Sequence, residues 1–421
     1  MWLLLLMIFI MPYEANPYLY LASNMFGVFP DFTVIKLLGL LGFSWAVVRL
    51  CSGHENTRLL VSRPALLFLL FFFGVAFMGV LHGTGFVAVS RFFAFLIFLP
   101  FVLVAVETPN DVRRVMKAMV LSLICVFPYA VRQMLRYNER LGVGLYETNY
   151  FATILVLVIP MAFVFAAQAP DAVRRTMWTL GGLLLVLELF LTSSRGGFLG
   201  LLVACMVFVY RRRGLSGALS IVAVLLLGLI IVPTDLGARL WTVFGGGAVD
   251  MPAGLEASNR AHEALFWAAL RMIADNPIFG VGPLNFKALS TTYTGLQQGN
   301  IAHNSFLEVA AEFGLPIFAI FMTLIFSTFR TLNRATRLAG TDAGWRIAGL
   351  AEGMRSGLLG FLVGGFFISA QYEKIFWLSV FLTIALGRFA REAAAVEATT
   401  EEREAAAEPD VILEPLPQPL P

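Results

Sequence analysis

Continuous apolar runs recur along the whole chain and are separated by short polar breaks. Most runs approach the roughly 20 residues that an α-helix needs to cross the hydrocarbon core of a bilayer. Strands of a membrane barrel would alternate apolar and polar side chains instead, so the runs predict an all-α polytopic membrane protein. We place about twelve transmembrane helices, at residues 1–22 (interrupted at Pro12), 33–50, 64–82, 91–107, 114–135, 149–167, 177–192, 196–210, 216–233, 303–329, 347–369 and 373–391.

Composition supports this class. Of the 421 residues, 59% are hydrophobic and 14% are charged, whereas soluble domains are roughly half apolar and a quarter charged. The opening run has no basic residue before it and no small-residue cleavage pattern after it, so we interpret it as retained rather than as a signal peptide. Cys51, Cys125 and Cys205 are scattered in or beside the runs, which favours packing roles over a disulfide framework or a metal site.

Basic residues orient the bundle, because the cytoplasmic loops of membrane proteins carry an excess of lysine and arginine. With a cytoplasmic N-terminus, those loops hold 14 basic residues, and the short outer loops and span ends hold six. Both termini are therefore predicted to be cytoplasmic. Arg195 then lies in a short break on the outer side, where positive charge is unusual. Snorkelling toward the membrane surface explains why a cation is tolerated there, but not why it is present.

A second group of outer cations lies at the end of the fifth run. Arg132, Arg136 and Arg140 recur every four residues, so they form one basic stripe if this helix extends beyond the membrane. An exposed helix end with snorkelling side chains would give the same pattern, and both interpretations stay open.

One outer connection, residues 234–302, is much longer than the others, and loops of that size are commonly either functional or disordered. Within it we predict a helix from about Arg260 to Asp275. Ser258 or Asn259 can cap this helix, and Pro277 helps to end it. We interpret the helix as lying against the membrane or the bundle.

The chain divides into a membrane domain and a tail. The domain is predicted to span residues 1–391. Residues 392–421 are rich in alanine and glutamate and then in proline, a composition that favours a disordered, cytoplasmic tail.

Several outer groups have the chemistry of a reaction site. Arg260 falls in the first turn of the loop helix, where free backbone N–H groups and the helix dipole favour an anion. The alternative is an ordinary surface arginine. His303 opens the tenth run and can take up a proton near neutral pH, so it is the best candidate base, although a structural histidine is the competing interpretation. Glu308 and Glu312 follow one and two turns further in, and ionisable groups inside membrane helices are functional candidates.

The sequence lacks several common catalytic signatures. It has no zinc motif, nucleotide-binding loop or Gly-x-Ser-x-Gly elbow, and its histidines do not have metal-ligand spacing. Gly280-Val281-Gly282-Pro283 is a turn rather than a dinucleotide fingerprint, because no strand precedes it.

Short motifs on the outer side form a set. They are Ser194-Arg195-Gly196-Gly197; Asn259-Arg260, followed by Trp267; Asp275-Asn276-Pro277-Ile278-Phe279-Gly280-Val281-Gly282; and His303-Asn304-Ser305-Phe306-Leu307-Glu308, with Phe313-Gly314-Leu315 downstream. Together they resemble the motifs of the O-antigen ligase and polymerase superfamily of bacterial inner-membrane glycosyltransferases. The core of the resemblance covers roughly residues 145–370. Within it, Glu147-Thr148-Asn149 resembles a family segment that usually reads Asp-Pro-Asn.

The resemblance implies a helical bundle of the kind called GT-C, with the long periplasmic loop closing over a cavity. It also implies a glycan donor on undecaprenyl diphosphate, an acceptor such as lipid A-core or another glycan or protein, and no metal, cofactor or nucleotide sugar. The reaction would take place at the periplasmic face of the inner membrane. The protein would be embedded in the lipid bilayer and would have no nucleic-acid partner. By matching motif, Arg195 and Arg260 would hold the diphosphate, and His303 would activate or position the acceptor hydroxyl. We expect further substrate contacts from Arg132, Arg136, Arg140, Asn149, Asn304, Glu308 and Glu312.

Three functions fit these patterns. An O-antigen ligase would move a finished glycan to an acceptor, and an O-antigen or exopolysaccharide polymerase would use the same donor chemistry. A transporter would also suit twelve spans with cytoplasmic termini. However, we see no inverted halves with paired broken helices, the usual pointer to a transport site at the midplane, and the candidate groups gather on one face. We therefore predict a glycosyltransferase, most simply of the ligase type.

Overall fold

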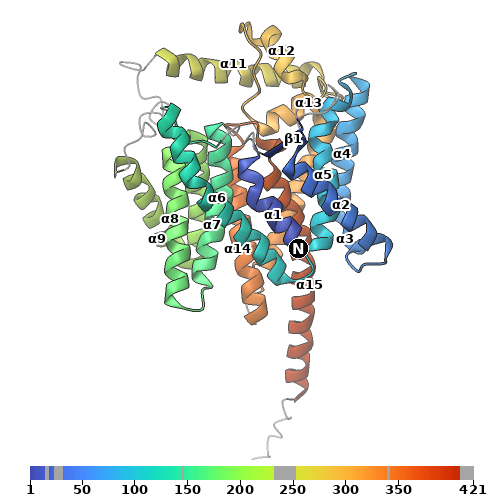
Figure 1. Cartoon of the computed structure of the whole chain (residues 1–421), viewed down its shortest axis with the longest axis vertical. Coiled ribbons are helices and arrows are strands. Elements are labelled where there is room, and N and C mark those ends of the chain that lie inside the picture. Colours follow the sequence, from blue (N-terminus) through green and yellow to red (C-terminus); the bar gives the residue numbers. More distant parts are fainter. Residues whose placement is uncertain are drawn as a thin grey trace, which may run out of the picture.

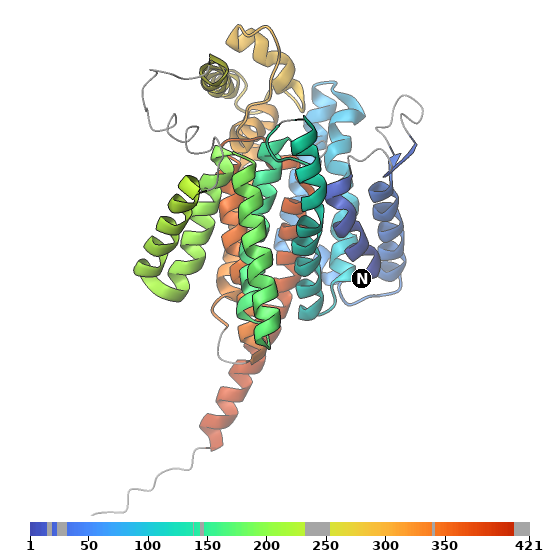
Figure 2. The same ribbon diagram turned by 60° about the vertical axis from the view of Figure 1, so that its left-hand side comes forward.

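The computed structural model describes residues 1–14, 19–22, 32–137, 139–143, 147–231, 253–338 and 342–407. Within these ranges the chain is built of helices, with one short antiparallel pairing between β1 (Tyr20–Ala22) and β2 (Phe32–Thr33). The helices form an upright bundle, and α11 (Ala253–Asp275) and α12 (Asn285–Thr294) lie across one of its ends (Figure 1). At the opposite end, α15 (Lys374–Ala407) leaves the bundle, as both views show (Figures 1 and 2).

Six of the described helices are long and apolar enough to cross a membrane. They are α2 (Val34–Cys51), α4 (Arg63–Leu81), α6 (Pro109–Tyr137), α7 (Thr148–Ala167), α9 (Arg195–Ile231) and α13 (Ser305–Ala335). This property confirms an all-α, multi-pass membrane protein. The other helical elements are α1 (Trp2–Ile10), η1 (Met11–Tyr13), α3 (Thr57–Leu60), α5 (Gly85–Ala105), α8 (Ala172–Leu191), α14 (Asp342–Gly364) and η5 (Ala370–Tyr372).

Helices occupy the apolar runs from residue 33 onward. Two neighbouring runs, 196–210 and 216–233, fall within the element α9, which consists of two helical segments that meet at Gly214. The backbone of Gly214 has a φ of 66°, in the left-handed region that glycine enters without a steric penalty. The polar break between the two apolar runs therefore separates two helical segments.

The first predicted span, residues 1–22, is interrupted at Pro12 as predicted, but its helical part is shorter than a membrane crossing. Its helix ends with η1 at Tyr13, because Pro12 has no backbone N–H to continue the hydrogen-bond pattern. At 1.5 Å per residue, the segment from Trp2 to Tyr13 rises about 18 Å, well short of the roughly 30 Å of a hydrocarbon core. The described part of this run is a short apolar helix.

The long loop and the tail also differ from the sequence-based prediction. Helix α11 begins at Ala253 rather than at Arg260, so Ser258 and Asn259 lie inside it and do not cap it. Helix α12 was not predicted. The tail that we expected to be disordered from residue 392 is helical as far as Ala407, because alanine and glutamate are strong helix formers. The rest of the tail and Gly245-Gly246-Gly247 lie outside the described residues.

Small residues let the central helices approach closely. Helix α7 is buried along most of its length, and α14 packs against both α7 and α9. A Cβ atom on Gly357 would overlap the carbonyl oxygen of Leu157, and one on Gly360 would overlap that of Gly200. Glycine at these positions brings the backbones together, as in other membrane bundles.

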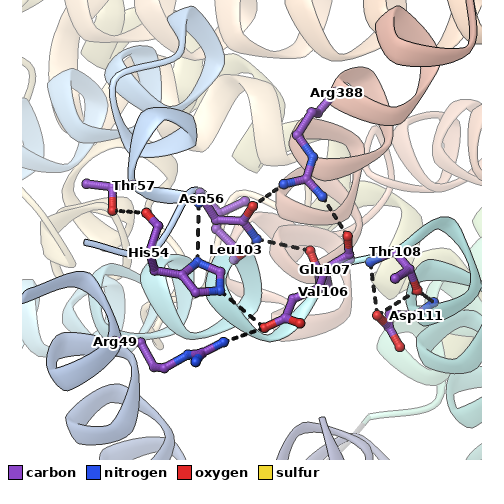
Figure 3. A network of polar contacts seen from close by, with 10 residues as sticks. All are labelled: Arg49, His54, Asn56, Thr57, Leu103, Val106, Glu107, Thr108, Asp111 and Arg388. Carbon is purple, nitrogen blue, oxygen red and sulfur yellow. Dashed lines mark hydrogen bonds and ion pairs between the residues drawn. The ribbon is translucent and has the colours of Figure 1, made fainter. Parts of the chain in front are cut away.

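A polar network fixes the bundle at the end away from α11 (Figure 3). The Arg388 guanidinium donates to the side-chain oxygen of Asn56 and, at 2.7 Å, to the carbonyl of Glu107. The Asn56 amide in turn donates to the carbonyl of Leu103 at 2.8 Å. The carboxylate of Glu107 accepts from Arg49 at 2.8 Å. These bonds join α15 to the segment that leads from α5 into α6.

Candidate functional site

A cavity of about 390 Å³ lies where α11 crosses the end of the bundle. Five segments line it: the start of α7, the start of α9, the middle of α11, the residues before α13 and the end of α14. Its lining residues are Asn149, Thr153, Ser194, Arg195, Gly196, Gly197, His262, Glu263, Phe266, Ala302, His303, Asn304, Gly364, Phe366, Phe367 and Ile368. The volume falls within the range of sites for small ligands.

Three helices begin at this cavity. These are α7 at Thr148, α9 at Arg195 and α13 at Ser305, and residues at or beside all three starts line it. The N-terminus of a helix carries roughly half a positive charge. Together with the Arg195 guanidinium, the three helix ends make a site suited to an anion.

The sequence around Arg195 makes the start of α9 compact. Ser193 adopts a left-handed conformation with φ 51°, and the Ser194 hydroxyl accepts a hydrogen bond from the backbone N–H of Gly197 at 3.3 Å. A Cβ on Gly196 would lie 2.7 Å from that of Phe367, and one on Gly197 would lie 2.6 Å from a carbon of α7. The two glycines therefore let α9 begin against α7 and the end of α14, which places Arg195 at the cavity.

The segment before α13 is held rigidly. His303 has a φ of 50°, and the Asn304 side-chain oxygen accepts from the N–H groups of Phe306 and Leu307, both at 3.0 Å, which caps the helix. The Ser305 hydroxyl donates to the carbonyl of Ile368 at 2.7 Å. The cap and this cross-link hold His303 at the wall of the cavity.

The Glu308 carboxylate connects this segment to the residues that follow α14. It accepts from the N–H of Ala302 at 2.9 Å, from the Ser369 hydroxyl at 2.5 Å and from the Gln371 amide at 2.8 Å. Glu308 is buried and lies outside the residues that line the cavity. These contacts indicate that it positions the His303 segment rather than a substrate.

Glu312 also lies behind the cavity wall. Its carboxylate accepts from the N–H of Phe286, in α12, at 3.3 Å and from the Tyr372 hydroxyl at 3.2 Å. Helix α13 is kinked at Gly314. The backbone just before the kink pairs with the turn after α11, where the Val281 N–H donates to the carbonyl of Ala311 at 2.8 Å. The predicted turn at Gly280 thus docks the loop onto α13.

His262 of α11 lies beside His303 in the cavity. The centroids of the two imidazole rings are 4.3 Å apart, with an angle of 53° between the planes. Within the described part of the chain, Nδ1 of His303 is buried and has no hydrogen-bond partner.

Burial keeps both rings neutral at neutral pH. It lowers the pKa of His303 to about 4. The pKa of His262 is also lowered to about 4, first by burial and then by the nearby His303 and Arg195, while Glu147 acts in the opposite direction. A neutral imidazole has one nitrogen that accepts a proton, so the pair can serve as a base without first losing a proton.

An apolar groove of about 600 Å³ adjoins the cavity. Phe266, Asn304, Phe366 and Phe367 line both spaces. The groove continues along one face of α9 and the end of α14, past Leu199, Leu202, Val203 and Val363. A polar cavity therefore opens onto an apolar path along membrane helices.

The structure brings together some of the predicted site residues but not all of them. Arg195, His303, Asn149 and Asn304 line the cavity, whereas Arg260 is exposed on α11 and lies outside its lining. Also outside the lining are Arg132, Arg136, Arg140, Glu308 and Glu312. The sequence-based reasoning missed His262, Glu263, Phe366 and Phe367 as lining residues.

The signal for His262 was present but weak. His262 and Phe266 are four residues apart in the predicted helix, so they share a face, but nothing in the spacing shows what that face contacts. Among the described residues, no three His, Cys, Asp or Glu side chains are grouped so that they could hold a metal ion.

Comparison with known families agrees with the resemblance. Residues 180–322 match the model of the O-antigen ligase family, so the predicted resemblance to the O-antigen ligase and polymerase superfamily is confirmed. The matched segment contains Arg195, His262 and His303, while Asn149 lies before it. Comparison with curated proteins gives no match.

Proposed function

We propose that this chain transfers a glycan from an undecaprenyl diphosphate carrier to an acceptor at the periplasmic face of the bacterial inner membrane, as an O-antigen ligase does. Its match to that family supports a membrane glycosyltransferase of the ligase or polymerase type. The observation that carries the finer proposal is the polar cavity with three helix N-termini, joined to an apolar groove. A polyprenyl diphosphate has the same two parts, an anionic head and an apolar chain.

The proposed topology follows the sequence-based prediction. About twelve membrane-embedded segments, the first of them the short helix that ends at Tyr13, form a GT-C-like bundle over residues 1–391. Both termini are cytoplasmic, and α11 and α12 of the loop 234–302 cover the periplasmic end. The excess of basic residues in the opposite loops supports this orientation.

In the proposed reaction, the acceptor hydroxyl oxygen attacks the anomeric carbon of the donor sugar as the bond from that carbon to the diphosphate oxygen breaks. Arg195 and the helix ends stabilise the negative charge that develops on the diphosphate, an effect that is strongest where water is excluded. His303 takes the proton from the acceptor hydroxyl. A single displacement of this kind inverts the anomeric configuration, so equal configuration in donor and product would overturn it.

Other predicted residues take outer roles in this proposal. Arg260 precedes His262 on α11 and supplies a second cation near the mouth of the cavity. Arg132 and Arg136 lie one turn apart at the end of α6, whereas Arg140 follows the end of this helix at Tyr137, so the three residues do not form the single helical stripe that the sequence predicted. In this proposal they still attract the anionic carrier. Asn149 and Asn304 line the cavity and position the donor.

The test uses the full chain in lipid nanodiscs, with an undecaprenyl diphosphate glycan and a candidate acceptor. A ligase forms glycan-linked acceptor and releases undecaprenyl diphosphate, whereas a polymerase lengthens the lipid-linked glycan with no other acceptor present. His303→Ala should abolish product formation while the protein still inserts and elutes as the wild type does. Absence of both products with every donor and acceptor tried, or full activity of His303→Ala, would contradict the proposal.

A further inference from the structure

A second, larger cavity lies at the opposite end of the bundle. It has a volume of about 960 Å³ and is formed by the start of α6, the end of α7, and the starts of α8 and α14. Four cationic side chains line it: Arg113, Lys117, Arg174 and Arg346. The proposed glycan transfer does not use this cavity.

This second cavity, called the basic cavity below, lies about one helix length away from the candidate reaction site. Helix α7 runs from Asn149 at the first cavity to Gln168 at the second, and α14 runs from Arg346 at the second to Gly364 at the first. Nearly twenty residues at 1.5 Å each span about 30 Å, which is the thickness of a hydrocarbon core. The two cavities therefore open at opposite membrane surfaces.

The described lining of the basic cavity contains cations but no carboxylates. Among the described residues, no Asp or Glu lines it, and Arg174 is the member that has an acidic partner, Asp171, at 3.4 Å. Repulsion among four such cations disfavours the empty cavity and favours an anion within it.

Neutral groups hold the cations in place. The Arg113 guanidinium donates to the Gln168 side-chain oxygen at 3.0 Å, and the Gln168 amide donates to the carbonyl of Arg346 at 3.2 Å. Gln168 thus links the end of α7 to α6 and α14. The positive-inside rule explains cations in these loops, but not their arrangement around one cavity.

Aromatic rings form the walls of the basic cavity. The Arg113 guanidinium lies 5.6 Å from the ring centroid of Phe165, and the Lys117 ammonium lies 5.8 Å from Phe165 and 5.6 Å from Trp178. Trp345 also lines the cavity. Tryptophan is enriched where the hydrocarbon core meets the lipid headgroups, so the cavity lies at headgroup depth.

An apolar surface continues from the basic cavity. Val173, Met177 and Leu180, on the face of α8 that flanks Arg174 and Trp178, are 70%, 67% and 60% exposed. Acyl chains can lie on that surface while a headgroup occupies the cavity. A soluble phosphate would not use it.

From these observations we propose that the basic cavity binds the phosphate of an anionic membrane lipid, in the leaflet opposite the candidate reaction site. Arginine donates paired hydrogen bonds to phosphate oxygens, and Lys117 adds a point charge beside them. Basic pockets between membrane helices hold anionic headgroups in this way. Inorganic phosphate shares the chemistry of the head but lacks the chains.

The experiment measures lipid adducts on the full chain by native mass spectrometry, with phosphatidylglycerol, cardiolipin and phosphatidylcholine as probes. We expect saturable binding of the two anionic lipids and at least tenfold weaker binding in the Arg113→Gln/Lys117→Gln double variant. Lys117→Gln alone should weaken binding severalfold. It is the variant to use if the double variant does not fold, because the contacts given above for Lys117 are to aromatic rings and its replacement leaves the bond between Arg113 and Gln168 in place. The matched control is Arg175→Gln, which changes an exposed arginine on α8 outside the cavity lining and should bind as the wild type does.

Competition distinguishes the two sources of phosphate. Inorganic phosphate at millimolar concentration should leave the lipid adducts in place. Displacement of the lipid by inorganic phosphate would overturn the assignment to a lipid. Equal binding in all three variants, equal loss in Arg175→Gln, or equal uptake of phosphatidylcholine would overturn the site.

Discussion

The imidazole rings of His262 and His303 lie 4.3 Å apart between centroids, although one belongs to α11 and the other precedes α13. This contact joins the long loop to the bundle inside the candidate site. Burial disfavours a charge on both rings, and the nearby His303 further lowers the pKa of His262. The pair therefore enters a reaction in its neutral form.

The first prediction concerns the pH dependence of transfer. With the pKa of His303 lowered to about 4, the base-competent neutral form dominates above that pH and is lost as the pH falls through it. We expect kcat/KM to be level near neutral pH and to fall below about pH 5, with an inflection near 4 rather than near the ordinary value of about 6.5. Initial rates with the protein in nanodiscs, checked for folding at each pH, measure this.

Three variants separate the roles of the two histidines and the nearby carboxylate of Glu263. His262→Phe retains a ring beside His303, so the acid inflection should remain near 4, because burial of His303 is itself sufficient to lower its pKa. His303→Gln should lose at least ~100-fold in kcat, the size expected for a missing general base. If the fall in rate at acid pH disappears in Glu263→Gln but persists in His303→Gln, then Glu263 is the base.

The second prediction tests the cation at the start of α9. Arg195→Ala should lower kcat by ~100–1,000-fold, as loss of one preorganised charge-stabilising group does. Arg195→Lys should recover only part of this, because an ammonium cannot form the paired bonds of a guanidinium. Arg271→Ala, which changes an exposed arginine on α11 outside the cavity lining, is the control and should keep wild-type rates. Equal losses in Arg195→Ala and Arg271→Ala would mean that overall charge is what matters.

Much of this site could be predicted from the sequence, because both a motif and the side of the membrane on which it lies can be identified from the residues around it. Arg195 and His303 each adjoin a helix start, and a helix start can be identified from the residues beside it. The contact between His262 and His303 could not be predicted, because it depends on how α11 docks onto α13. Glu308 was assigned to the substrate for a related reason: its partners Ser369 and Gln371 are more than sixty residues away in the sequence, so nothing near Glu308 shows that its oxygens are already occupied.

In the fold, too, some features could be predicted from nearby residues and others depended on contacts between distant ones. Apolar runs determined where helices form, whereas the break at Gly214 and the short first helix depended on single residues that bend or stop a helix. The close packing of α7 on α14 depends on glycines whose spacing is visible in the sequence but whose contacts are not.

The third prediction concerns the apolar groove. Leu202→Trp, which places a larger side chain in the groove lining, should raise KM for an undecaprenyl donor by about tenfold, in line with the 1–3 kcal/mol that overpacking costs. A donor with a short prenyl chain should show little change, because it does not reach this part of α9. Met206→Trp, one turn further along α9 and outside the groove lining, is the control. Equal effects of Leu202→Trp on long and short donors would show that the chain does not follow the groove.

The fourth prediction compares two buried carboxyl groups by their partners. Glu308 accepts three hydrogen bonds, whereas both side-chain oxygens of Glu188 are buried without a partner in the described part of the chain. Glu308→Gln replaces an acceptor by a donor that faces other donors and should cost roughly 1–3 kcal/mol. Glu188→Gln should be close to neutral, because a buried carboxyl group without a partner is protonated and uncharged, as is the amide that replaces it. Thermal unfolding in detergent compares them, and loss of transfer without loss of stability in Glu308→Gln would restore a substrate role for Glu308.

The fifth prediction links packing in the bundle to the cavity. Gly357→Ala places a methyl group against the carbonyl oxygen of Leu157, and overpacking of this kind costs about 1–3 kcal/mol. The control is Gly39→Ala in α2, where the nearest atom to the new methyl is the Met7 sulfur at 3.9 Å. That change should be neutral or stabilise α2 by up to ~1 kcal/mol, because alanine is the better helix former.

The two alanine variants should also differ in activity. Helices α7 and α14 both end at the reaction cavity, at Asn149 and Gly364, so separating them by even a few tenths of an ångström moves its walls. Transfer by Gly357→Ala, measured well below its unfolding temperature, should therefore fall further than transfer by Gly39→Ala, because misplacement of reacting groups by about 1 Å can cost 100-fold. Wild-type kcat together with a lowered unfolding temperature in Gly357→Ala would show instead that the α7–α14 contact stabilises the bundle without setting the geometry of the site.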